Sequence, residues 1–147
     1  MINLLYPKTT LLFLGLFLSI GASAQCKGFT KRNCLPGLEP YLSNGQLNAA
    51  QMTAGQNAEV QLTFSKGLSY RLLVCTDPYF ENTIYLLKSL DDTVLATDTI
   101  TDTYVVQDIE VDQTQPLMLQ IQLPEIENTT DIVRDGCVTI LIGFKED

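Results

Sequence analysis

Apolar and polar residues alternate with a period of two along several segments of the chain. In residues 59–64 valine, leucine and phenylalanine alternate with polar side chains, and residues 70–75 repeat the pattern. Such alternation is typical of half-buried strands. The short glycine-containing connection at 65–67 predicts that these two strands form a β-hairpin.

Further strands are predicted along the rest of the chain. They cover 84–90, 94–97, 104–111, 117–123 and 137–144, and the segment 45–52 fits either a strand or a short helix. After residue 24 no apolar stripe at helical spacing is evident, so the helices that a parallel α/β sheet needs are lacking. The pattern therefore predicts an all-β fold, a small antiparallel β-sandwich of roughly seven to nine strands.

The N-terminus has the pattern of a secretory signal peptide. Lys8 precedes the apolar run 11–20, and Ala22-Ser23-Ala24 supplies the small residues that signal peptidase requires. We expect cleavage after Ala24, so that 1–24 is the signal peptide and 25–147 is a single domain. The apolar run is shorter than the roughly 20 residues that span a bilayer. The sequence thus predicts a secreted, periplasmic or cell-envelope protein, with no membrane insertion after signal cleavage.

The charge balance is strongly acidic. The chain has 9 Lys and Arg against 17 Asp and Glu, a formal net charge of −8. Nucleic acids are bound through clustered basic side chains, and the main basic cluster here is Lys27, Lys31 and Arg32. We interpret that cluster as a solvated loop and expect no nucleic-acid partner.

Four cysteines follow the predicted cleavage site, which predicts two disulfides in an exported protein. Zinc is the competing use, but the chain has no C-x-x-C pair and no histidine. Cys75 and Cys137 lie on the strand faces opposite the apolar sets, so both thiols are expected to face outward. If their strands are neighbours, Cys75 bonds Cys137, and Cys26 bonds Cys34 to close a small N-terminal loop.

The sequence contains no recognisable active site. Without histidine the commonest general base is lacking, and no G-x-S-x-G or phosphate-binding glycine loop occurs. We therefore expect no catalytic activity and no cofactor. Structural calcium remains open, because acidic residues fall in or beside predicted loops, although their spacing matches no specific calcium loop. These residues are Asp98, Asp102, Asp108 and Asp112.

Two aromatic residues are candidates for ligand contact. Tyr79 and Phe80 follow Pro78 at a predicted loop tip. There they either contact a partner or a sugar ring, or pack over the end of the sandwich.

Several short motifs resemble secreted bacterial proteins related to the p24 or GOLD-domain family. They are Cys26-Lys27-Gly28-Phe29-Thr30, Cys34-Leu35-Pro36, Asn44-Gly45-Gln46-Leu47-Asn48 and Tyr70-Arg71-Leu72-Leu73-Val74-Cys75. The resemblance covers most of 26–144 and implies a jelly-roll or GOLD-like β-sandwich with protein contacts. It does not extend to the transmembrane helix of p24 cargo receptors, so their trafficking role is not implied.

Together these observations predict an exported, non-catalytic binding or accessory module of the bacterial cell envelope. Its partner is expected to be a protein of the envelope, contacted through loops or a sheet edge. The alternative is a carbohydrate- or small-ligand-binding sandwich that uses Tyr79 and Phe80.

Overall fold

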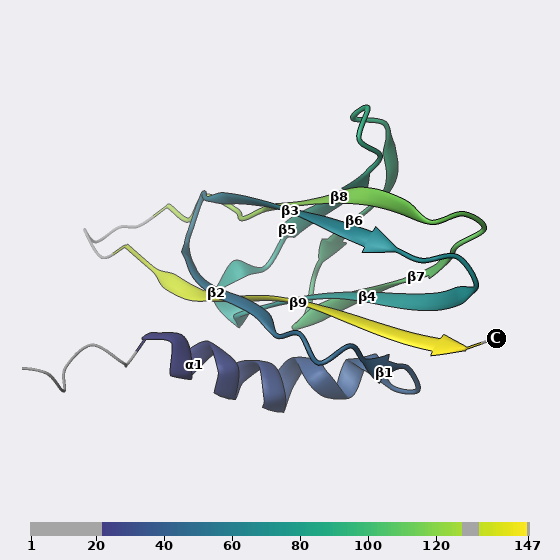
Figure 1. The fold of residues 1–147 in the computed structure, drawn as a ribbon. Helices are drawn as coiled ribbons and strands as arrows, with labels where there is room; N and C mark the ends of the chain where they lie inside the picture. The colour runs from purple at the N-terminus through teal and green to yellow at the C-terminus, as the bar shows by residue number, and fades with distance from the viewer. Residues whose placement is uncertain (1–21, 128–132, 147) are drawn as a thin grey trace, which may run out of the picture.

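The computed structural model describes residues 22–127 and 133–146, and within them the chain forms an antiparallel β-sandwich (Figure 1). The predicted all-β fold is confirmed. The signal-peptide prediction falls largely on residues 1–21, which lie outside the described residues. The strands are β1 (Leu42–Ser43), β2 (Asn48–Thr53), β3 (Asn57–Phe64), β4 (Leu68–Thr76), β5 (Thr83–Lys88), β6 (Val94–Ile100), β7 (Tyr104–Glu110), β8 (Gln115–Gln122) and β9 (Asp135–Glu146).

The strands divide into two sheets. The first has the order β1-β9-β4-β7, and β2 pairs with the other half of β9, next to β1. The second has the order β3-β8-β5-β6. The ambiguous segment 45–52 therefore provides a strand, β2, rather than a helix. Strand β4 lies inside the first sheet, with β9 on one side and β7 on the other.

The main core lies between the sheets and is formed by the alternating apolar residues. In β3, Leu62 and Phe64 are buried while the residues on either side of Leu62 are exposed. Phe64 meets Tyr70 of β4 edge to face, with 5.0 Å between ring centroids. Burying each such side chain contributes about 1.5–3 kcal/mol, so the period-two pattern is the main source of the fold's stability.

The hairpin predicted from 65–67 is not formed. Strand β3 pairs with β8 in one sheet, whereas β4 pairs with β7 and β9 in the other. The connection therefore crosses from sheet to sheet, and Gly67 supplies the positive φ of 85° that the crossing requires. Alternation alone does not distinguish two strands that pair from two strands that face each other across a core.

The N-terminal segment adds a helical layer that the sequence pattern did not indicate. Helix α1 (Ala22–Phe29) continues into a π-helical turn (Thr30–Cys34) and a 3-10 turn (Leu35–Leu38). We call this segment the N-terminal cap. In Figure 1 it runs along the outer face of the sheet that contains β2, β9 and β4. The cap covers a second small core that includes Leu38, Leu73 and Leu141.

All four cysteines form disulfides, but the predicted pairing is wrong. The structure joins Cys26 to Cys137 and Cys34 to Cys75. Although β4 and β9 are neighbours, the residue opposite Cys75 is Thr139, so Cys137 lies on the diagonal, about 7–8 Å away and beyond disulfide reach.

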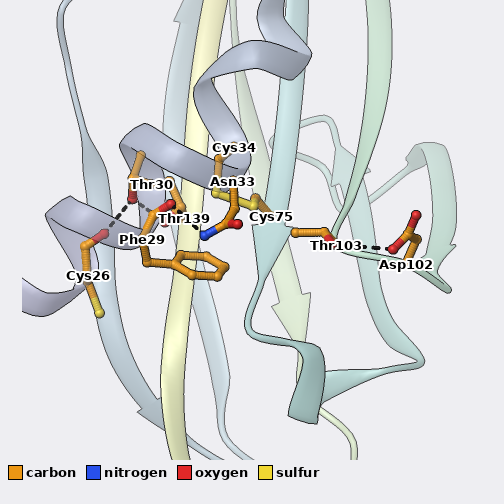
Figure 2. Close-up of a disulfide and its surroundings, with 9 residues drawn as sticks. All are labelled: Cys26, Phe29, Thr30, Asn33, Cys34, Cys75, Asp102, Thr103 and Thr139. Carbon is orange, nitrogen blue, oxygen red and sulfur yellow. Dashed lines mark hydrogen bonds between the residues drawn. A yellow bond between two sulfur atoms is a disulfide. The ribbon is translucent and has the colours of Figure 1, made fainter.

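Helical geometry gives the second reason. Cys26 and Cys34 are two turns apart in the cap, which corresponds to about 12 Å of helix and exceeds the span of a disulfide. Both thiols instead face the sheet, together with Thr30 midway between them. Figure 2 shows the Cys34–Cys75 bond and the hydrogen bond of 2.8 Å between the hydroxyls of Thr30 and Thr139.

The two strand cysteines point away from the main core, as predicted, but they do not face solvent. Cys75 is completely buried and Cys137 is nearly so. The cap covers this face of the sheet and excludes water from both bonds.

Candidate functional site

The most prominent surface feature is the hairpin formed by β5 and β6. Figure 1 shows that its turn projects beyond the body of the sandwich. Among the described residues, strand β6 is the last strand of its sheet and pairs only with β5. We call residues 88–95 the hairpin tip.

A β-bulge shapes the hairpin tip. Leu87 is opposite Ala96, but the next pair is Lys88 with Val94, so Leu95 is an extra residue on the β6 side. Such an insertion bends the strand and increases its local twist. The bulge therefore redirects the last residues of the hairpin away from the plane of the sheet.

The turn itself is braced by hydrogen bonds. The amide of Ser89 donates to the carbonyl of Thr93 over 2.9 Å, and that of Asp92 donates to the carbonyl of Ser89 over 3.1 Å. The Asp91 carboxylate accepts from the Ser89 hydroxyl and from the amide of Thr93. These hydrogen bonds, chiefly the one from the Ser89 hydroxyl, lower the pKa of Asp91.

Three large apolar side chains are exposed on this braced turn. Leu90 is 58% exposed, Leu95 52% and Val94 47%. Exposed apolar side chains are ordinary when scattered, but a cluster on a projecting element is typical of a contact surface. The hairpin tip thus combines a fixed backbone with apolar side chains that remain about half exposed.

The structure separates the two aromatic residues predicted as ligand contacts. Both belong to a short 3-10 turn (Pro78–Phe80). Phe80 is completely buried in the main core and lies against Gly136, so of the two alternatives considered for it packing is the one observed, and it is not available as a ligand contact. Tyr79 is 55% exposed, and the guanidinium of Arg134 lies 5.0 Å from its ring centroid. One ring therefore fills the core while the other stays at the surface.

The four acidic residues considered for calcium lie in different places. Asp98 is in β6, Asp102 follows β6, Asp108 is in β7 and Asp112 follows β7. In the described part of the chain, no three side chains of the metal-binding types converge on one point. The structure therefore assigns these carboxylates no common site.

Asp108 instead forms an ion pair on the outer face of the first sheet. Its two carboxylate oxygens accept from Nε and Nη2 of Arg71 at 2.7 and 2.8 Å. Arg71 also donates to the Glu39 carbonyl and lies over the ring of Tyr41, 4.6 Å from its centroid. The hydrogen bonds that Arg71 donates to the carboxylate lower the pKa of Asp108. This group ties the end of the N-terminal cap to β4 and β7.

The comparisons with known proteins give structural similarities only. No family model matches the chain, and no curated protein matches its sequence. A solved structure with some likeness is PliG of Aeromonas hydrophila, a periplasmic lysozyme inhibitor of g-type lysozyme. It superposes with a TM-score of 0.47 at 6% sequence identity, over 73% of this chain and 90% of that chain. Such a likeness establishes no shared function.

Across 22–127 and 133–146, none of the helices is long and apolar enough to cross a membrane. Both disulfides are formed, and such bonds persist in oxidising compartments.

Sequence reasoning did not find the hairpin tip. The signal was present, because Leu90 and Val94 flank the polar residues Asp91, Asp92 and Thr93, which favour a turn. Their exposure, however, follows from the position of β6 at a sheet edge, and that position depends on pairings between distant strands.

Proposed function

We propose that this protein is an exported, non-catalytic binding module that presents the hairpin tip to a protein of the cell envelope. The observation that carries the proposal is the cluster of Leu90, Val94 and Leu95 on a projecting, hydrogen-bonded turn. A rigid turn loses little conformational entropy on binding. Its apolar side chains would gain about 25 cal/mol for each Å² buried in a partner's pocket.

The shape of the tip indicates the kind of partner surface. A convex apolar tip fits a concave pocket better than a flat surface. Asp91 and Asp92 follow Leu90 in the sequence and add negative charge to the tip, so hydrogen-bond donors or basic groups at the pocket rim would complement it. The resemblance to GOLD-domain proteins agrees with protein contacts and stays a prediction.

Export is part of the same proposal. Two buried disulfides hold the N-terminal cap, so folding depends on an oxidising compartment. The predicted signal peptide would deliver the chain there.

The test compares full-chain variants in their ability to retain an envelope protein. Leu90→Ser with Leu95→Ser removes the apolar tip, while Leu42→Ser removes an equally exposed leucine from β1 in the other sheet. Each is immobilised, incubated with envelope extract of the native host, and analysed by quantitative mass spectrometry. We expect a partner that the wild type and Leu42→Ser retain and that the tip variant loses at least tenfold.

Circular dichroism controls for folding, because all three substituted positions are exposed and the variants should melt like the wild type. Retention of the same proteins by all three forms, or of none by the wild type, would refute the proposal.

A further inference from the structure

A second surface feature lies away from the hairpin tip, at the open side of the sandwich between β3 and the β1–β2 connection. There the two sheets leave a hollow of about 420 Å³. We call it the amide hollow, because its polar side chains are mostly carboxamides. Its volume lies within the range of about 300–1,000 Å³ that is usual for small-molecule sites.

The walls of the amide hollow carry neutral hydrogen-bonding groups and no charged side chain. Polar groups come from the β1–β2 loop and from β3, while aromatic and aliphatic side chains of β4 and β9 form the apolar part. The principal residues are Asn44, Gln46, Gln61, Thr63, Tyr70 and Phe144. A charged ligand would leave its charge unpaired in this hollow, which is costly when the charge is desolvated.

The loop that carries two of the amides has a fixed conformation. The carboxamide oxygen of Asn44 accepts from the backbone amide of Gln46 over 3.0 Å, and Gly45 between them has a φ of 81°. The backbone amide of Asn44 donates to the Ile142 carbonyl over 3.1 Å, which anchors the loop to β9, and the side-chain nitrogen of Asn44 donates to the carboxamide oxygen of Gln46 over 3.4 Å. The side chains of Asn44 and Gln46 are therefore held at the mouth of the hollow.

The phenol of Tyr70 is also positioned by the backbone. Its oxygen accepts from the amide of Ser65 over 3.0 Å, which leaves the phenolic proton available to donate. The ring is largely buried against Phe64. The hollow thus has one fixed hydroxyl in addition to its carboxamides.

This combination matches the chemistry of a sugar. Each carboxamide has a donor and an acceptor on one planar group, which suits neighbouring hydroxyls that also donate and accept. The apolar face of a pyranose ring can pack on Phe144 and the aliphatic floor. We propose that the amide hollow binds an uncharged sugar ring, a function beyond the protein contact assigned to the hairpin tip.

An extended peptide fits the hollow less well. A peptide strand is bound through a continuous strand edge, and on the first-sheet side that edge is interrupted where the chain leaves β1 at Ser43 and resumes β2 at Asn48. Side-chain amides occupy the interruption, and they favour a compact ligand. A second, apolar hollow of about 230 Å³ lies between β2 and β3. Only a longer, extended ligand would fill it, and a single sugar ring would not.

The experiment follows side-chain and backbone amide signals of the ¹⁵N-labelled protein by NMR. The probes are uncharged mono- and disaccharides of glucose, galactose, mannose and N-acetylglucosamine, with glucuronic acid and an uncharged hexapeptide for comparison. We expect at least one neutral sugar at millimolar concentration to shift the carboxamide signals of Asn44, Gln46 and Gln61, and glucuronic acid to bind at least tenfold more weakly.

Matched variants decide whether the amides are the cause. Gln61→Ala should weaken sugar binding at least tenfold, while Gln51→Ala, an exposed carboxamide on β2 outside the hollow, should leave it unchanged. Three results would overturn the proposal. They are no shift with any neutral sugar, equal binding by Gln61→Ala, and selective binding of the hexapeptide with shifts along the β3 backbone.

The result is independent of the partner assay. The hairpin-tip variants keep the amide hollow intact, so they should bind the sugar like the wild type even if no protein partner is found.

Discussion

At the scale of single residues, buried threonine hydroxyls differ in how well their hydrogen bonds are satisfied. The buried hydroxyls of Thr30 and Thr139 bond each other beneath the N-terminal cap. The hydroxyl of Thr76 is equally buried and has no hydrogen-bond partner among the described residues. A buried polar group without a partner costs about 1–3 kcal/mol, so these two sites should respond oppositely to the same substitution.

Thr76→Val should stabilise the protein. The change keeps the shape of the side chain and removes the unsatisfied hydroxyl, so we expect the free energy of unfolding to rise by about 1 kcal/mol. Thr139→Val is the matched control, because it leaves the Thr30 hydroxyl with one bond fewer and should destabilise. Urea denaturation of both variants measures the two effects, and a loss of stability in Thr76→Val would contradict the assignment.

The Arg71–Asp108 pair should contribute a pH-dependent part of stability. Arg71 lowers the pKa of Asp108 in the folded protein, so the unfolded chain takes up its proton first as the pH falls. The contribution is therefore present above the ordinary aspartate pKa of about 3.9 and is lost as the pH falls through the lower folded value. Because the Asp108 side chain is 49% exposed, we expect at most about 1 kcal/mol at neutral pH.

Asp108→Asn tests this contribution. The variant should be less stable than the wild type at pH 7, and the difference should shrink in strongly acidic buffer. Urea midpoints measured across this range give the answer, and a difference that stays constant down to about pH 3 would show that the pair acts through packing rather than charge.

At the scale of elements, the N-terminal cap is fixed by contacts along a single stripe. Cys26, Thr30 and Cys34 are spaced four residues apart, so they share one helical face. Opposite them lie Thr139 of β9 and Cys75 of β4. The spacing continues to the buried Leu38, but the other three members of the stripe are two cysteines and a threonine. A search for apolar helical periodicity therefore does not find this helix.

Removing either disulfide should destabilise the fold. Cys26–Cys137 closes a loop of 111 residues and Cys34–Cys75 one of 41. By the chain-entropy model their removal costs about 5 and about 4 kcal/mol respectively. We expect the double variant Cys26→Ala/Cys137→Ala to unfold at lower urea than Cys34→Ala/Cys75→Ala, with both below the wild type.

Peptide mapping without reduction provides the control for this pairing. Each double variant should keep the other disulfide intact and show no free thiol. Recovery of a Cys75–Cys137 crosslink from the wild type would contradict the structure, and unchanged stability in either variant would show that its bond does not constrain the cap.

The elements also show what sequence pattern can and cannot supply. The strands that carry Leu62, Leu72 and Leu119 were predictable, because each buries one face in the main core. Which strands share a sheet was not predictable, because the sequence of 65–67 is typical of a hairpin turn although it connects two sheets. The disulfide pairing failed for the same reason, since it depends on the register of β9 and on a helix defined by tertiary contacts. For Tyr79 and Phe80 the sequence left contact and packing as alternatives, and it could not show that Phe80 alone turns inward.

At the scale of the whole molecule, the two sheets are unequally covered. Strand β4 is buried on both faces, by the main core on one side and by the cap on the other. Its sequence carries the signal, because Leu73 and Cys75 place large apolar groups on the face that alternation assigns to solvent. Strand β6, by contrast, is exposed along most of its length.

This asymmetry predicts a hierarchy of local stability. Amides of β4 and the middle of β9 should exchange with deuterium only on global unfolding, because strands border both sides and each of these strands is anchored to the cap by a disulfide. Amides of β6 should exchange through local opening, since β6 has one strand partner and few buried contacts. Hydrogen exchange followed by mass spectrometry should resolve peptides 68–76 and 94–100.

Reduction separates the contribution of the cap from that of the sheet. With both disulfides reduced, exchange in β4 should accelerate much more than exchange in β6, because only β4 loses a covering layer. If β6 were as protected as β4 in the oxidised protein, the projecting hairpin would have to be packed against another surface, and its apolar side chains would not be free to bind a partner.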